Sequence, residues 1–171
     1  MDINILIAAL PSVNSWIDGY IAKHANSKVR LSDAGFSRLP GYFSSQLLES
    51  SYYVLVPRIE SPPLSDLGLG ALSFFEGGNY GGITYKDTFF ATSRNESLHF
   101  HEMIHIIQWN ELGPEKFLLA YGVGLVRFGY RNSPLEQIAY SMQAQFDARQ
   151  QLEDVESIVR KHCREVIQTI G

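Results

Sequence analysis

The feature that most constrains the fold is a pair of histidines, four residues apart, inside an apolar segment. The motif His101-Glu102-Met103-Ile104-His105 lies within residues 93–112, a segment whose pattern predicts a helix. On a helix, residues four apart share a face, with Cβ atoms about 5–6 Å apart. Two histidines and a glutamate are costly to bury there unless something compensates them. We therefore expect an apolar helix whose histidines and glutamate are compensated by a bound metal ion.

The spacing of this motif favours zinc. Two imidazoles on one helix face can share a Zn²⁺ ion at about 2.0–2.1 Å each. Glu102 lies one step further around the helix, so we expect it to miss the metal and to act as a general base on a metal-bound water. The alternative is that His101 and His105 are two partly exposed histidines at the edge of the core, each hydrogen-bonded to a neighbour.

A catalytic zinc requires a third protein ligand and one open position. Glu136 is the favoured candidate, because it follows residues 133–135 (Ser-Pro-Leu) at the start of a later helix, 31 residues after His105. A separate helix can bring that carboxylate across to the two histidines. The same residues have the spacing of a capping box, so the alternative is that Glu136 caps its own helix.

Three further residues are candidates for this site. Tyr140, four residues after Glu136, shares its helix face, and we expect it to orient a ligand or to donate a hydrogen bond to an oxyanion. Its alternative is a buried tyrosine that packs the helix. Glu111 would reach the metal only through a sharp turn near Gln108, where no glycine stands. His99 is a weak candidate, because on a straight helix it points about 200° away from His101.

The rest of the chain predicts strands and loops first and helices afterwards, which is typical of an α+β domain. We expect a single domain, 1–171, with a helical portion (1–50), a sheet portion (51–92) and a helical portion that carries the zinc site (93–171). The expected helices are 3–25 with an interruption near Pro11, 42–48, 93–112 capped by Ser93, 115–121, 133–149 and 155–170, with a connector at Gly122, Gly124 and Gly129. The expected strands are 51–56 and, as one strand or a tight hairpin, 83–85 with 88–91.

The composition argues against several classes of protein. The 171 residues carry 14 basic and 18 acidic side chains, a formal charge of −4, so there is no positive surplus to drive nucleic-acid binding. Cys163 is the only cysteine, which excludes an internal disulfide. We see no stretch near the roughly 18 apolar residues that a membrane-spanning helix needs, and the apolar residues 5–10 follow Asp2 instead of a basic residue. We therefore expect a cytoplasmic protein with no membrane partner.

Two segments together resemble a known family. Residues 101–109 (His-Glu-Met-Ile-His-Ile-Ile-Gln-Trp) and 132–140 (Asn-Ser-Pro-Leu-Glu-Gln-Ile-Ala-Tyr) are similar to short bacterial gluzincin-type zinc metallopeptidase domains, including those found near contractile-injection-system and toxin modules. The resemblance covers roughly residues 51–149. It implies a zincin-like fold, one zinc ion on His101, His105 and Glu136, and Glu102 as general base. It also implies that residues 83–91 supply the edge strand that pairs with a bound peptide.

The sequence departs from the thermolysin-like pattern at one place. That pattern has an aspartate four residues after the ligand glutamate, where Tyr140 stands here. The leading hypothesis is a zinc-dependent peptidase acting on a peptide or protein substrate. The first alternative is a zinc-bound but non-catalytic domain of the same fold that binds a protein or peptide. A structural protein without any metal is the second alternative, and the oligomeric state stays open.

Overall fold

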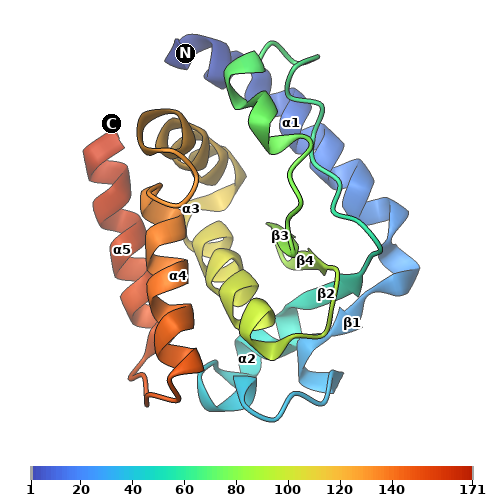
Figure 1. Cartoon of the computed structure of the whole chain (residues 1–171), viewed down its shortest axis with the longest axis vertical. Helices are drawn as coiled ribbons and strands as arrows, with labels where there is room; N and C mark the ends of the chain where they lie inside the picture. Colours follow the sequence, from blue (N-terminus) through green and yellow to red (C-terminus); the bar gives the residue numbers. More distant parts are fainter. Residues whose placement is uncertain (1, 171) are drawn as a thin grey trace.

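The computed structural model describes residues 2–170, which form an α+β fold (Figure 1). Within this range a four-stranded mixed sheet is combined with five α-helices and several short 3-10 turns. The helices are α1 (Ile3–Lys23), α2 (Ser45–Ser50), α3 (Glu96–Phe128), α4 (Pro134–Asp147) and α5 (Val155–Ile170). The strands are β1 (Val29–Arg30), β2 (Tyr52–Leu55), β3 (Gly82–Tyr85) and β4 (Thr88–Ala91). The predicted α+β class is confirmed at this level.

The sheet has the strand order β1-β2-β4-β3. Strand β2 runs parallel to β4, whereas β1 and β3 are antiparallel to their neighbours. Of the two alternatives for residues 83–91, the structure shows the tight hairpin, closed by Lys86 and Asp87. Of the two hairpin strands only β3 lies at an edge, since β4 is enclosed by β2 and β3. The portion 1–50, expected to be helical, also contributes β1 to the opposite edge.

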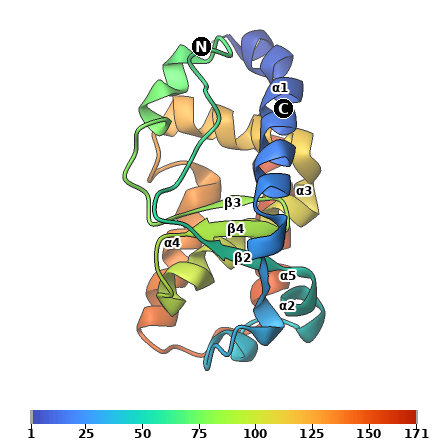
Figure 2. The same cartoon turned by 90° about the vertical axis from the view of Figure 1, so that its right-hand side faces the viewer.

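Strand β4 is buried on both faces, which explains why its sequence does not alternate between apolar and polar residues. On one face the ring of Phe90 lies 4.6 Å from the ring of Tyr20 of α1. On the other face Phe89 lies 4.9 Å from His99 of α3. Helices α1 and α3 therefore cover opposite faces of the sheet, as the view in Figure 2 also indicates.

Helix α1 is continuous through Pro11, so the predicted interruption is wrong. Proline removes one helical hydrogen bond, but the packing of the apolar face outweighs that cost. The buried residues of this face are Leu6, Ala9, Leu10, Val13, Ile17 and Tyr20. By length and composition α1 could also cross a membrane, contrary to the expectation from the sequence, although 33% of its most apolar window is buried in the protein. The core helix of a protein can have the same length and composition, so the cytoplasmic location stays a prediction.

The N-cap of α3 lies two residues later than the predicted cap at Ser93. Its N-cap is Asn95, whose side chain accepts hydrogen bonds from the backbone N–H groups of Ser97 and Leu98 at 2.9 and 3.4 Å. Glu96, the expected partner in a capping box, instead accepts from the backbone N–H groups of Arg38 and Leu39 at 2.7 and 3.0 Å. The tertiary contact with the N-terminal region thus replaces the local box.

The predicted break at Gly113 divides α3 into two segments. Gly113 has φ 72° and ψ 166°, a conformation outside the helical region that favours glycine. The second segment then runs to Phe128, so the predicted connector at Gly122 and Gly124 is wrong and only Gly129 ends the helix. Close packing explains the glycine inside it, because a Cβ at Gly122 would lie 2.9 Å from Leu6 of α1. The bend at Gly113 changes the direction of the helix, so the second segment does not continue along the axis of the first.

The C-terminal helices α4 and α5 complete the fold. Helix α4 starts at Pro134 with Ser133 as its N-cap and ends at Asp147, two residues before the predicted end at 149, while α5 has the predicted bounds. Both pack on α3, so the first segment of α3 lies between them and the sheet (Figure 1). Helix α2 begins three residues after the expected start at 42, with the Ser44 side chain accepting from the N–H of Leu47 at 3.2 Å.

Candidate metal centre

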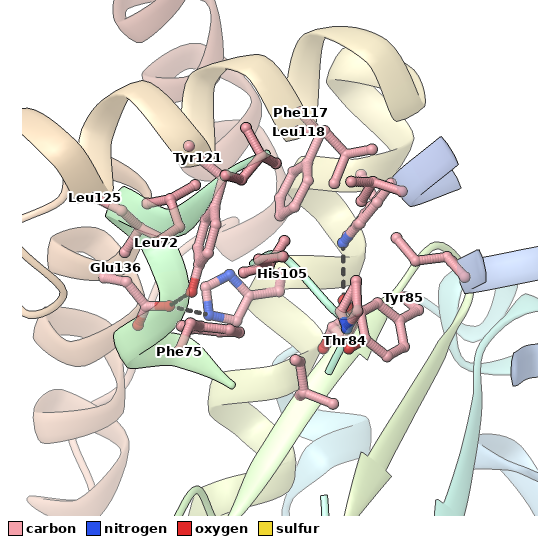
Figure 3. Close-up of a pocket in the computed structure, with 18 of the residues that line it drawn as sticks. Leu72, Phe75, Thr84, Tyr85, His105, Phe117, Leu118, Tyr121, Leu125 and Glu136 are labelled. Carbon is pink, nitrogen blue, oxygen red and sulfur yellow. Dashed lines mark hydrogen bonds and ion pairs between the residues drawn. The ribbon is translucent and has the colours of Figure 1, made fainter. Parts of the chain in front are cut away.

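The three residues predicted as metal ligands lie together in the structure. His101 and His105 come from the first segment of α3, and Glu136 comes from the first turn of α4. The Nε2 atoms of the two histidines are 3.1 Å apart. Glu136 Oε2 lies 3.4 Å from His101 Nε2, and Glu136 Oε1 lies 3.4 Å from His105 Nε2. Figure 3 shows the His105 ring and the Glu136 carboxylate facing each other. This buried group could hold one metal ion.

These distances fit the coordination of a small divalent cation. Ligands at about 2.0–2.1 Å in a tetrahedron are separated by about 3.3 Å, close to the three distances observed. Glu136 Oε2 is also buried without accepting a hydrogen bond. A buried carboxylate oxygen left this way is costly, and a metal ion would satisfy it. The donor set and its spacing therefore fit a metal.

The structure disagrees with the alternative for Glu136 and with the exposure, though not the hydrogen bonding, that the alternative for the two histidines assumes. His101 and His105 are only 4% and 5% exposed, so they are not partly exposed residues at the edge of the core. The carboxylate of Glu136 points toward the histidines instead of capping α4, and the Ser133 side chain makes no capping hydrogen bond. The side chains of His101 and His105 from α3 and of Glu136 from α4 thus point toward one another.

Two glutamines orient the histidine rings. His101 Nδ1 lies 3.1 Å from Gln143 Oε1, and His105 Nδ1 lies 2.8 Å from Gln108 Oε1. An amide oxygen only accepts, so each Nδ1 carries the proton, and each Nε2 is directed at the candidate metal position. Gln108 Nε2 in turn donates to the backbone carbonyl of Leu135 at 2.8 Å, next to Glu136. Such outer partners fix the tautomer and the direction of a ligand.

The charges of the centre stabilise one another without a metal. Burial by itself lowers the pKa of His105, but the carboxylate of Glu136, hydrogen bonding and Glu102 outweigh it and raise this pKa to about 9. Burial by itself raises the pKa of Glu136, yet the two histidines lower it well below its usual value. An imidazolium and a carboxylate thus share the space that a divalent cation would occupy.

Glu102 is held apart from the three ligands, on the side of β3. It is 3% exposed, and its Oε2 accepts a hydrogen bond from the Thr84 hydroxyl at 2.7 Å. Burial raises the pKa of Glu102, although His101 and His105 partly offset this effect. A Cβ at Gly82 would lie 2.5 Å from Glu102 Oε1, so a residue without a side chain allows β3 to approach this carboxylate. Its role as general base stays a prediction.

Tyrosine side chains approach the centre from two helices. The Tyr121 hydroxyl, on the second segment of α3, donates to Glu136 Oε1 at 2.6 Å (Figure 3). The ring of Tyr140 lies 4.6 Å from the ring of His101, which suits support of that ligand, but Tyr140 does not line the adjoining cavity. Tyr121 and Tyr130 do line it. A catalytic role for Tyr140 therefore stays a prediction, and Tyr121 is a neighbour that the sequence did not reveal.

The two weaker ligand candidates lie elsewhere, as expected. His99 is buried against the sheet, and its Nε2 lies 2.9 Å from the carbonyl of Ser93. Burial lowers the pKa of His99 to about 4. Glu111 instead accepts from Arg160 and Arg164 of α5 at 3.4 and 2.7 Å.

The free edge of β3 is partly covered. The indole N–H of Trp109 donates to the carbonyl of Thr84 at 3.1 Å. In an antiparallel pair alternate residues direct both backbone groups outward, so Gly82 shares this edge with Thr84. A peptide added here would find Gly82 and the N–H of Thr84, but not the Thr84 carbonyl. The available edge is therefore narrower than the expected span of residues 83–91.

Some of the missed residues left a signal in the sequence. Gln108 stands three residues after His105, and Gln143 stands seven residues after Glu136, so each lies on the face of a predicted ligand. No such signal identifies Tyr121, because its contact with Glu136 depends on the bend at Gly113. No family model matches the chain, and no curated protein or solved structure is significantly similar to it.

Proposed function

We propose that this protein is a zinc-dependent peptidase of the gluzincin type with a zincin-like fold. The observation that carries the proposal is a group of three buried donor residues beside a second carboxylate, Glu102, that is held separately. His101, His105 and Glu136 would hold the ion, and Glu102 would face the reacting atoms. A metal-binding helix next to a sheet with an antiparallel edge strand, β3, also supports this fold.

Zinc is favoured by the chemistry of the donors. Two histidine nitrogens and one glutamate oxygen form a ligand set used by catalytic zinc, which retains one position for water or substrate. When bound there, zinc would lower the pKa of its water and polarise the carbonyl to be attacked.

The residues of the chain would have separate tasks in hydrolysis. The carboxylate of Glu102 accepts a proton from the attacking water and passes it to the nitrogen of the leaving amine. The Thr84 hydroxyl holds that carboxylate through its 2.7 Å hydrogen bond. Gln108 and Gln143 keep the two histidine rings in place. The backbone of β3 at Gly82 would align the peptide by strand addition.

The test combines metal content with hydrolysis. We expect the purified protein to contain one zinc per chain by elemental analysis and to cleave a mixed peptide pool, with cleavage lost on chelation and restored by zinc. Glu102→Gln should retain zinc and lose cleavage, because an amide cannot accept the proton. Glu111→Gln is the matched control, since Glu111 lies outside the centre.

Each outcome separates the hypotheses. Cleavage by Glu102→Gln at the wild-type rate would show that Glu102 is not the general base. Stoichiometric zinc without any cleavage by the wild-type protein would favour the non-catalytic, peptide-binding alternative. Absence of any bound metal after zinc loading would refute the metal centre and leave a structural role.

A further inference from the structure

An apolar cavity adjoins the candidate metal centre. The space inside it, open solvent included, is about 800 Å³. The walls come from α1, the 3-10 turn at Gly70–Phe75 with the loop before it, β3 and the second segment of α3. Figure 3 shows Phe117, Leu118 and Leu125 lining the space beside His105 and Glu136. The metal centre therefore opens onto a hydrophobic chamber.

The charged groups of this cavity all belong to the metal centre. Its lining residues include two carboxylates, Glu102 and Glu136, and the ring of His105, but no lysine or arginine. A terminal carboxylate of a peptide would find no cation among these side chains. The terminal amine of a peptide would find no carboxylate among these side chains other than Glu102 and Glu136, which belong to the metal centre. Recognition of a chain end at this place is thus disfavoured.

Of the five neutral polar side chains in the wall, four donate to another part of the chain and are not free to select a polar ligand, and Tyr130 is the fifth. The donations run from Thr84 to Glu102, from Trp109 to the Thr84 carbonyl, from Tyr85 to the Glu60 carbonyl and from Tyr121 to Glu136. Apart from the Tyr130 hydroxyl and the metal centre, the wall of the cavity is aliphatic and aromatic surface.

We propose that this cavity is the specificity pocket of the enzyme and takes one large aliphatic or aromatic side chain of an internal peptide residue. This inference rests on the proposed function and adds the substrate class: an endopeptidase that selects an apolar residue. The walls would bind a longer apolar group more tightly, by about fourfold for each added methylene that enters the cavity.

Straight-chain alkyl hydroxamates test the pocket, because the hydroxamate binds zinc and the alkyl chain reports on the adjoining space. Their dissociation constants for the zinc-loaded protein would be measured by calorimetry from two to eight carbons. Metal-free protein would be titrated with 1-octanol, which requires no metal. Peptides with leucine, phenylalanine, glutamate or lysine at one internal position would give the ratio of kcat/KM values.

Two adjacent leucines on α3 provide a matched pair of variants. Leu118 and Leu119 are both half-buried, but only Leu118 lines the cavity. Leu118→Arg should lower the affinity for the octyl hydroxamate at least tenfold and shift peptide preference toward glutamate. Leu119→Arg should change neither quantity. Circular dichroism would show that both variants fold.

The results separate this inference from the proposed function. Affinity that rises with chain length in the wild-type protein supports the pocket even if Leu118→Arg does not fold. Affinity independent of chain length, or cleavage without preference for apolar residues, overturns the pocket while zinc and hydrolysis stand. If no zinc binds, the proposed function fails, and 1-octanol then decides the cavity: binding lost in Leu118→Arg supports an apolar site, and no binding to wild type refutes it.

Discussion

Gln108 joins His105 to the helix that carries the third candidate ligand. Its Oε1 lies 2.8 Å from His105 Nδ1, and its Nε2 donates to the carbonyl of Leu135, the residue before Glu136. Gln108 is fully buried, so both hydrogen bonds are shielded from water. One amide therefore sets the direction of the His105 ring and its distance from α4.

Replacing this amide should loosen the centre. In Gln108→Leu the His105 Nδ1 and the Leu135 carbonyl lose their partners, which costs about 1–3 kcal/mol of unfolding free energy. Under the proposed function, zinc affinity should fall about 10–100-fold, because the ring is no longer held. Urea unfolding and competition with a coloured chelator measure the two effects. Gln137→Leu, at an exposed position of α4, is the control. Equal zinc affinity in both variants would contradict the role of Gln108 in holding the His105 ring.

Tyr121 should tune the carboxylate of Glu136. Its hydroxyl donates to Oε1 at 2.6 Å, whereas Oε2 has no hydrogen-bond partner and would be free to bind an ion. Tyr121→Phe removes that donor inside the protein and should weaken zinc binding about tenfold. The affinity would be measured by the same chelator competition. Tyr42→Phe, which loses a hydrogen bond to the carbonyl of Gln150 far from the site, should keep wild-type affinity.

Gly82 should be required for the position of Glu102. An alanine Cβ would lie 2.5 Å from Glu102 Oε1, so β3 or the carboxylate must move. We expect Gly82→Ala to retain zinc, to lose most peptide hydrolysis and to cost about 1–3 kcal/mol of stability. Gly81→Ala is the neighbouring control, because its Cβ would meet Leu98 at an ordinary 3.5 Å. Full hydrolysis by Gly82→Ala would show that Glu102 needs no such clearance.

His99 should make the protein sensitive to acid. Burial lowers its pKa to about 4, against about 6.5 in an unfolded chain, so the unfolded state binds the proton more readily. Its contribution to stability is complete above pH ~6.5 and is lost as the pH falls toward ~4, up to about 3 kcal/mol. His99→Gln, which retains a donor for the Ser93 carbonyl, should lose less stability over this range.

Urea unfolding of metal-free protein at several pH values measures this difference without a contribution from metal release. Because wild type and variant share every other titrating group, the difference between their slopes belongs to His99. Identical slopes from pH 6.5 to 4 would mean that His99 titrates as it does in the unfolded chain.

Local periodicity by itself determined several features of this protein. The spacing of His101 and His105 places them on one helix face, and the pattern of residues 155–170 predicted α5 with its observed bounds. Glu136 could be proposed as a partner because it opens a separate helix. These inferences succeed because a helix relates residues three or four apart through its own geometry.

Only the tertiary structure decided how these pieces meet. The bend at Gly113 brings Tyr121 over Glu136, and α1, from the N-terminal part of the chain, closes the apolar cavity beside the centre. The same packing keeps α1 helical through Pro11 and turns Glu96 from its expected cap to Arg38 and Leu39. Such contacts depend on how surfaces far apart in the sequence pack together. A pattern of neighbouring residues does not determine that packing.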